Sequence, residues 1–554
     1  MECVVRVGWT DRFGDEGGGA DHLGMRVAGE AAYTQLIDFT TTQTWRPRYL
    51  SFYCWLLRQA FRAAGGDENR SENELDHAVW QETLKKGDYA YVAASLLVDP
   101  TAKRIAGSDK IGKRIAKGEI AILTDHLRSK RGGFDAYAGP MRQMGLVERA
   151  SLRGGLLFDR PYGRGRVLAE AFEDSLSGVD QDQLLDKGAT DGEKLRELGE
   201  RCGLTVMLEP VGSSSAVGAE LSKLRSCIVD WEGANNSEGL RRRILSIGLI
   251  LRLFKLHESS RPGLLEFREF TLLASYRHDE GRRSHQLAEA YAPVVPSWAL
   301  YEAHAFATYA LECLLFGVLE VSETLEISSP DGVPINLALK KMAECVGSGS
   351  SFQGIFVSDD WYQRPLSELL ATLRDVVSAG SGATTTETEI FERIQGSKDI
   401  LIWAGDALLL FLISVERLRA LLKLHGESAW PGSTDEGRLP PATLISRVDA
   451  LDLSGPVGEI VPEILLQLVA RQHRRTALRK LAANFTPDTA LFQLEGRLLV
   501  DLVDLTRFAP GTSNPRFGNA VQYLEDLGYL HRDDAPGLTQ EGEALLARIE
   551  KGVP

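Results

Sequence analysis

The chain has little of the material from which metal centres are built. Its 554 residues include only six cysteines and ten histidines. The cysteines form no Cys-x-x-Cys pair, and the histidines never approach a metal-ligand spacing, so we predict neither a metal site nor a cofactor. Most cysteines fall in apolar helical segments, which is typical of reduced core thiols in a cytosolic protein.

Catalytic and membrane signatures are also lacking. The sequence contains no phosphate-binding P-loop, no Gly-x-Ser-x-Gly elbow and no complete dinucleotide fingerprint. The longest apolar run, residues 400–415, is shorter than the roughly 18–20 residues that cross a bilayer, and Asp406 interrupts it. The first residues lack the apolar region of a signal peptide. We therefore expect a cytoplasmic chain without membrane association and, on balance, without enzymatic activity.

The composition is that of a globular protein, with 44% apolar and 25% charged residues. The net charge of −14 argues against a surface uniformly adapted to nucleic acid. Residues 101–174 nevertheless hold 15 Lys+Arg against 9 Asp+Glu, a local charge of +6. Residues 456–554 carry −2, so the remaining chain carries −18. A local basic face is therefore compatible with the acidic total.

Apolar residues recur at helical spacing through most of the chain, which predicts a mainly α, multi-domain protein. Flexible, Gly- and Ser-rich stretches separate the periodic segments. We predict an N-terminal helical domain, an acidic connecting region, a central helical bundle and a C-terminal domain, at residues 1–174, 175–236, 237–440 and 456–554 respectively.

The C-terminal domain begins with a predicted helix over residues 465–484, whose basic face includes Arg474 and Arg475. A later helix opens at Asn514-Pro515, with apolar residues at i, i+3, i+4 and i+7 from Phe517. Gly528 predicts its end. A strand pair then turns through the sequence DDAPG, and Thr539 is placed to cap the final helix.

The pattern LEDLGYL…LTQEGEALL resembles the recognition helix, wing and last helix of winged helix-turn-helix domains, over about residues 465–550. The resemblance implies outward-facing DNA contacts from the recognition helix at Arg516, Asn519 and Gln522, and a wing contact at Arg532. The sequence departs from a DNA-binding surface in charge, because acidic residues crowd the same region: Glu525, Asp526, Asp533 and Asp534.

A second segment, MRQMGLVERA…GRVLAEAF, has the same order of signals: a helix ending at Gly145, a strand pair and a helix beginning near Gly165. Basic residues precede it, which favours contact with backbone phosphates. Four fall on one helical face and three cluster before the turn: Lys110, Lys113, Arg114 and Lys117, then Arg128, Lys130 and Arg131. The alternative interpretation is a solvated face that offsets the acidic body of the protein.

The aromatic stretch over residues 45–61 permits two interpretations. Aromatic side chains from Trp45 onward could stack on bases while Arg46 and Arg48 bind phosphate. Alternatively, Tyr49 and its neighbours form the buried stripe of an amphipathic core helix, which the spacing favours.

Residues 21–57 resemble the start of uncharacterised bacterial proteins associated with antiphage defence. Together with the two winged-helix patterns, this resemblance implies a non-enzymatic, DNA-binding or DNA-sensing subunit of a bacterial multi-protein system. The expected partners are DNA, other subunits and further copies of the chain. Two alternatives remain: a protein–protein adaptor that docks through its winged helices, and a nuclease with an unrecognised site, for which Arg252 and His257 are the candidates.

Overall fold

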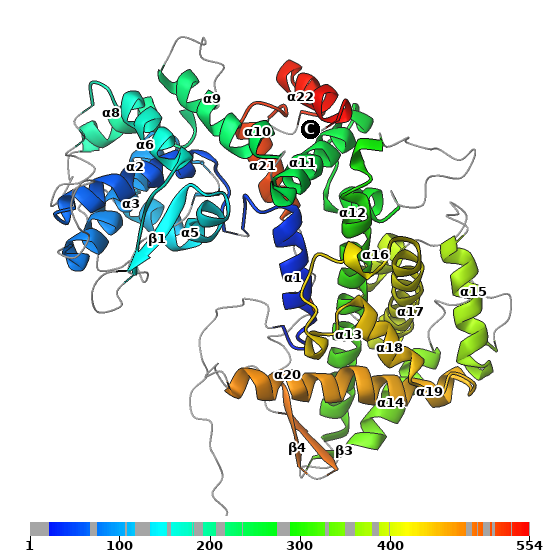
Figure 1. Ribbon diagram of the computed structural model, residues 1–554. Coiled ribbons are helices and arrows are strands. Elements are labelled where there is room, and N and C mark those ends of the chain that lie inside the picture. The colour runs from blue at the N-terminus through cyan, green and yellow to red at the C-terminus, as the bar shows by residue number, and fades with distance from the viewer. Residues whose placement is uncertain are drawn as a thin grey trace, which may run out of the picture. The chain divides into compact units, whose positions relative to one another are not determined.

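The computed structural model is mainly helical (Figure 1), which confirms the predicted fold class. It describes residues 21–41, 43–66, 75–102, 104–105, 108–116, 133–151, 157–179, 181, 192–206, 216–234, 237–273, 289–326, 332–348, 360–378, 387–397, 399–482, 490–495, 497–501, 510–511, 516–532 and 535–552. The chain forms two compact units. Unit 1 comprises residues 1–33, 271–286 and 295–513, and unit 2 comprises residues 34–270, 287–294 and 514–554.

These units do not follow the domain boundaries expected from the sequence. Residues 456–554 are divided between the two units at Ser513, and the N-terminal region is divided at Tyr33. The reason is that several helices pack against segments far away in the chain. Such long-range packing leaves no compositional mark in the sequence, so linker-like stretches alone do not reveal it.

Unit 1 is built around two long apolar helices, α13 (Val295–Glu326) and α17 (Ile400–His425), which pack against each other. The described part of unit 1 also holds shorter helices, of which the first continues into unit 2 after Tyr33: α1 (Met25–Leu36), α14 (Ile335–Ser348), α15 (Leu366–Ser378), α16 (Glu387–Gly396), α18 (Pro441–Asp449), α19 (Val457–Ile464) and α20 (Arg471–Ala482). An 18-residue window of α13 is apolar enough to cross a membrane, but 89% of it is buried within the protein. That burial is compatible with the core helix of a soluble protein.

A small antiparallel sheet lies in unit 1, with the strand order β3-β5-β4. The strands are β3 (Val333–Pro334), β4 (Phe492–Glu495) and β5 (Leu498–Asp501). Leu499 of β5 pairs with both outer strands, opposite Val333 and Leu494, and is fully buried. The sheet thereby ties the segment after α20 to the start of α14.

Unit 2 contains the aromatic helix α2 (Arg48–Ala63), which packs against α3 (His77–Val98) and α6 (Arg164–Ser175). Its other helices are α4 (Ser108–Ile115), α5 (Phe134–Gln143), α8 (Gly192–Cys202), α9 (Ala216–Ile228), α10 (Trp231–Ala234), α11 (Glu238–Leu256), α12 (Leu264–Leu273), α21 (Phe517–Asp526) and α22 (Gln540–Glu550). Its one described sheet is the hairpin of β1 (Val147–Ser151) and β2 (Leu157–Pro161).

Unit 2 holds two helix–strand–strand–helix segments, which we call the N-module (residues 134–175) and the C-module (residues 517–550). The N-module has the predicted order α5, β1, β2, α6. In the C-module, the strand pair between α21 and α22 is reduced to a single antiparallel bridge between Leu530 and Leu538. Thr539 caps α22, as predicted, by accepting a hydrogen bond from the Gly542 amide at 3.1 Å. The predicted helix opening at Asn514-Pro515 lies outside the described residues.

The two modules share the geometry of the turn after their first helix. Each first helix is followed by a glycine with positive φ, Gly145 at 67° and Gly528 at 73°. The amide of the next residue donates to the carbonyl five residues earlier, at 2.8 Å in both modules. Its own carbonyl then accepts the amide of the returning chain. The common sequence signals therefore correspond to a common backbone structure, whereas membership of the winged-helix class stays a prediction.

A glycine allows each second helix to pack directly on that turn. A Cβ atom on Gly165 would lie 1.8 Å from the Leu146 carbonyl oxygen, and one on Gly542 would lie 2.0 Å from the Tyr529 carbonyl oxygen. Real Cβ atoms do not approach an oxygen so closely, so any side chain there must displace backbone.

We expect Gly165→Ala to lower the free energy of unfolding by about 3 kcal/mol, the upper end of overpacking costs, because backbone cannot yield as a flexible side chain does. Urea unfolding of the full chain would measure the loss. The matched control is Gly112→Ala in α4, at a helical glycine where the added Cβ would meet nothing within 4 Å beyond its own chain neighbours and helix backbone. It should leave stability unchanged or raise it slightly. Equal stability of the two variants would contradict the close packing.

Candidate nucleic-acid interface

Helix α20 ends a continuous helical stretch that begins at α19 and passes through a π-helical segment, residues 465–470. The predicted basic helix over residues 465–484 is thus confirmed as far as Ala482. π-Helical turns are rare in proteins, and those that occur are often found at functional sites. The distribution of side chains around α20 therefore bears directly on function.

The inner face of α20 holds the segment that leads into α1. Gln472 donates a hydrogen bond from Nε2 to the Leu23 carbonyl at 2.7 Å. Two turns further on, Lys480 donates from Nζ to the Asp21 carbonyl at 2.6 Å. These bonds fix the rotation of α20 about its own axis, and so decide which side chains face solvent.

His473 forms the central contact of the same face. The Leu491 amide donates to its Nε2 at 3.0 Å, which places the ring proton on Nδ1. That nitrogen lies 3.0 Å from the His22 carbonyl oxygen and donates to it. Burial is the main reason that the pKa of His473 is lowered to about 4. The ring is therefore neutral at physiological pH and serves as a structural link.

The outer face of α20 is rich in arginine. This face holds residues at i, i+3, i+4, i+7 and i+8, all of them exposed: Arg471, Arg474, Arg475, Leu478 and Arg479. We call these five residues the arginine face. Leu478 is 56% exposed, which is unusual for a large apolar side chain. The spacing spans roughly 12 Å along the helix, at 1.5 Å per residue.

The charges of this face are largely unneutralised. Arg474 and Arg475 form no ion pair within the described part of the chain. Arg479 lies 3.6 Å from Asp435, which is the closest acidic contact recorded for the face. Burial, and then the positive charge of Arg475, lower the pKa of Arg447 on α18, although Glu436 acts in the opposite direction, so a fifth cation lies near Arg475. An exposed guanidinium cluster of this kind suits bidentate binding of phosphate oxygens.

The predicted recognition-helix residues are not on the surface. Asn519 is fully buried, Arg516 is 5% exposed and Gln522 is 8% exposed. The prediction that these three side chains face outward is therefore wrong. Both sides of α21 are covered, so it offers no polar face to DNA.

The buried polar groups of α21 bind the backbone of the segment before α2. Asn519 donates from Nδ2 to the carbonyls of Thr41 and Thr44, at 2.9 and 2.8 Å. Arg516 donates from Nη1 to the Thr40 carbonyl. These donors satisfy carbonyls that would otherwise be buried without partners. Their role is thus to hold the chain in place.

The acidic residues of α21 have partners too. Asp526 accepts a hydrogen bond from Arg46 Nη1 at 2.7 Å and another from Gln522 at 2.9 Å. Gln522 in turn accepts from Arg104 at 2.7 Å. Glu525 pairs with Arg261. Two of the four acids that the sequence sets against DNA binding, Glu525 and Asp526, are therefore parts of internal ion pairs, whereas Asp533 and Asp534 lie outside the described residues.

Few of the predicted N-terminal contacts fall on described side chains. Lys113 is exposed on α4, whereas Lys110 and Arg114 lie on the same helix with side chains that are not described. Four more lie outside the described residues: Lys117, Arg128, Lys130 and Arg131. Arg532 is half-buried in the turn of the C-module. Among the described members of the predicted set, only Arg474 and Arg475 lie together on an exposed face.

The aromatic stretch of α2 is core. Tyr49, Phe52, Tyr53 and Leu56 are each fully buried, which confirms the interpretation as an amphipathic core helix. The phosphate-binding interpretation of Arg48 is wrong, because this side chain is 1% exposed. Its partners lie inside unit 2.

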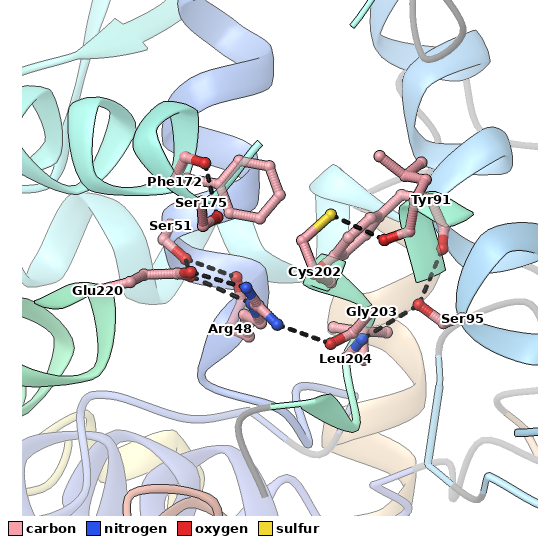
Figure 2. A network of polar contacts seen from close by, with 11 residues as sticks. Arg48, Ser51, Tyr91, Ser95, Phe172, Ser175, Cys202, Gly203, Leu204 and Glu220 are labelled. Carbon is pink, nitrogen blue, oxygen red and sulfur yellow. Dashed lines mark hydrogen bonds and ion pairs between the residues drawn. The ribbon is translucent and has the colours of Figure 1, made fainter. Parts of the chain in front are cut away.

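Arg48 forms a buried ion pair with Glu220 of α9 (Figure 2). The two side chains meet through Nη2–Oε2 at 2.8 Å and Nε–Oε1 at 3.3 Å. Arg48 also donates from Nη1 to the Gly203 carbonyl at 2.9 Å, and Ser51 donates to Glu220. The pair thereby joins α2, α9 and the end of α8.

The candidate nuclease pair is not isolated from other charges. Arg252 lies on α11 with its Nη1 atom 3.6 Å from Glu550 Oε1. His257 is the residue at which α11 ends. The nuclease alternative stays a prediction, since the structure does not test it.

A buried carboxyl near α20 gives unit 1 a pH dependence. Glu312 of α13 pairs with Arg26 and accepts the Gly511 amide at 3.2 Å. Burial outweighs these contacts and raises its pKa to about 7. Between pH 4.5 and 7 the folded state therefore holds a proton that the unfolded state releases, so this group makes stability fall as pH rises through that interval.

We expect Glu312→Gln to flatten that dependence. The free energy of unfolding of the wild type should fall more from pH 5 to pH 7.5 than that of the variant, as measured by urea titration at each pH. Identical pH profiles would show that Glu312 is ionised in the folded protein throughout.

Comparison with known proteins adds no family: no family model, curated protein or solved structure matches the chain. Its function is therefore inferred from its own residues. The sequence predicts only part of the arginine face. It predicts a basic helix, but it does not show which residues of that helix contact residues 21–23 and are therefore turned away from solvent. Three arginines were therefore not predicted as site residues and are added from the structure: Arg471, Arg479 and Arg447.

Proposed function

We propose that this chain is a non-enzymatic protein that binds duplex DNA through the arginine face of α20. The observation that carries the proposal is the division of this helix into two sides. Gln472, His473 and Lys480 hold the chain's own backbone, while four arginines on the opposite side remain exposed. A helix held rigidly with its cations outward is suited to lie against a phosphate backbone.

The chemistry of the face favours phosphate contact over base recognition. Its polar members are all arginines, and the asparagine and glutamine that would read adenine edges are buried in α21 instead. Leu478 can pack against sugar carbons between the bound phosphates. The chain outside residues 101–174 and 456–554 carries −18, and this charge disfavours binding of the duplex to those parts. Binding should therefore depend little on sequence and strongly on salt.

Fluorescence anisotropy of a short labelled DNA duplex, titrated with the full chain at several salt concentrations, tests the proposal. Four phosphate contacts predict a slope of log K against log salt of about −3 to −4 for B-form DNA. The same strand unpaired should show a shallower slope. Absence of binding at low salt would overturn the proposal.

An adaptor function is the second candidate, and the exposed Leu478 favours it. A partner protein with an acidic, partly apolar groove would complement the charge of the four arginines, as a duplex does, and would also bury Leu478. The salt titration separates the two, because a protein partner would co-purify with the chain while free duplex fails to bind.

We also propose, from the resemblance of residues 21–57, that this DNA binding serves a multi-protein bacterial defence system in the cytoplasm. The other subunits of that system would be partners of the chain. Residues 21–23 contact α20 directly, so the segment that carries the resemblance also orients the arginine face. Co-purification of the tagged chain from its native host would test the association.

A further inference from the structure

Unit 2 contains a surface pocket of about 370 Å³ that includes no residue of α20. Its walls come from α6 of the N-module, α22 of the C-module and the helices α9 and α10. The volume lies within the range of small-molecule sites, roughly 300–1,000 Å³. The pocket therefore has room for a ligand of metabolite size.

Three cationic side chains enter the pocket from three different helices. Arg164 begins α6, Lys223 lies on α9 and Arg548 lies on α22. Two acids, Asp230 and Glu232, line it as well, so the lining carries a formal charge of +1. Convergence of cations from separate elements favours an anionic group in the centre.

The acids are not equivalent. Both carboxylate oxygens of Asp230 have partners within the protein. Its Oδ2 lies 2.5 Å from Arg164 Nη1, and its Oδ1 accepts a hydrogen bond from the Gly233 amide at 2.8 Å. Asp230 thus orients Arg164, which also donates to the Ser226 carbonyl at 3.3 Å. Glu232 is exposed and forms no ion pair within the described part of the chain. Its carboxylate is free to accept hydrogen bonds from a ligand.

A flat surface completes the pocket. The Arg548 guanidinium lies over the Trp231 ring, with its carbon 4.0 Å from the ring centroid. Stacking of this kind holds the planar guanidinium in one orientation, which reduces the entropy lost on binding a phosphate. The same stack presents flat faces on which an aromatic base can lie.

We propose that this pocket binds a nucleoside monophosphate. The phosphate lies among Arg164, Lys223 and Arg548. The base stacks on the layer formed by Trp231 and Arg548. Glu232 accepts hydrogen bonds from the sugar hydroxyls, a role that carboxylates play in nucleotide sites. Each chemical part of the ligand thus has a matching group.

Isothermal titration calorimetry of the full chain with adenosine 5′-monophosphate, adenosine and inorganic phosphate tests the site. The monophosphate should bind about ten-fold or more tightly than either part alone, since only it uses both the cations and the stack. Lys223→Glu and Arg548→Glu should each weaken this binding by about ten-fold or more. Arg196→Glu, the same charge change at an exposed position of α8, should leave it unchanged. Thermal unfolding of every variant checks that it remains folded.

Several outcomes would overturn the proposal. Monophosphate binding that matches that of inorganic phosphate would reduce the pocket to a general anion site. Full-strength binding by Arg548→Glu would place the ligand elsewhere. Competition by a 5′-phosphorylated oligonucleotide, but not by its 5′-hydroxyl form, would assign the pocket to a nucleic-acid end and overturn the free nucleotide as ligand. None of these results depends on the arginine face, so the two proposals fail separately.

Discussion

Replacing Arg48 with methionine should lower the free energy of unfolding of this protein by about 3–5 kcal/mol, the cost of breaking a buried ion pair. Glu220 is fully buried, and Arg48 is its only cationic partner among the described residues. The variant leaves that carboxylate with the Ser51 hydroxyl alone. Urea unfolding, followed by a probe of unit 2 such as tryptophan fluorescence, measures the loss.

The local electrostatics give the reason for so large an effect. Burial opposes the charge of Arg48, yet the Glu220 carboxylate outweighs it and raises the pKa of Arg48 above its usual range. Each charge therefore exists in the interior because of the other. Removing one partner leaves the full desolvation cost of the second.

A double-mutant cycle separates the pair from the packing around it. Arg48→Met combined with Glu220→Leu should recover most of the stability lost by Arg48→Met alone, because no charge is then buried without a partner. The Gly203 carbonyl, which accepts from Arg48, still lacks its donor in that variant, so recovery should be incomplete. A double variant less stable than both single variants would contradict a coupled pair.

The sequence predicts those features of the fold that local chemistry decides. Glycine at the end of a helix, followed by signals for a strand pair and a second helix, predicted the order of elements in both modules. These signals act within a few residues, so distant packing does not change them. The helical period likewise predicted α20, because the residues of one helix face recur three or four positions apart in the sequence.

The prediction that the polar residues of α21 face solvent is wrong because of packing by a segment far away in the sequence, which local signals do not reveal. Periodicity separates an apolar side from a polar side, and polar sides usually face solvent. Here the segment before α2 covers the polar side, and Asn519 and Arg516 bind its carbonyls from more than 470 residues away. In the sequence, an asparagine that hydrogen-bonds backbone carbonyls cannot be distinguished from one that hydrogen-bonds a DNA base. Only tertiary structure distinguishes them.

The division of the chain into unit 1 and unit 2 results from the same packing between segments that are far apart in the sequence. Residues 21–23 lie against α20, and the segment before α2 lies against α21. The predicted C-terminal domain is therefore shared between two units, and its basic helix and its expected recognition helix have separate surroundings. DNA binding, if assigned to α20, requires no contribution from the module that resembles a winged helix.

The double charge reversal Arg474→Glu and Arg475→Glu should weaken duplex binding by about 100-fold or more at moderate salt and reduce the salt slope by about 2, one unit for each lost phosphate contact. Both side chains are exposed and unpaired within the described residues, so the substitutions should leave stability almost unchanged. Anisotropy titrations at several salt concentrations measure both quantities in one experiment.

The matched control reverses two exposed lysines on other helices of unit 1, Lys340 on α14 and Lys423 on α17. It changes the net charge by the same amount, so any general effect of a more acidic protein appears equally in both variants. A loss confined to the arginine variant places the phosphate contacts on α20. An equal loss in both would instead mean that the duplex responds to total charge, and that the exposed arginines and Leu478 serve an acidic protein partner.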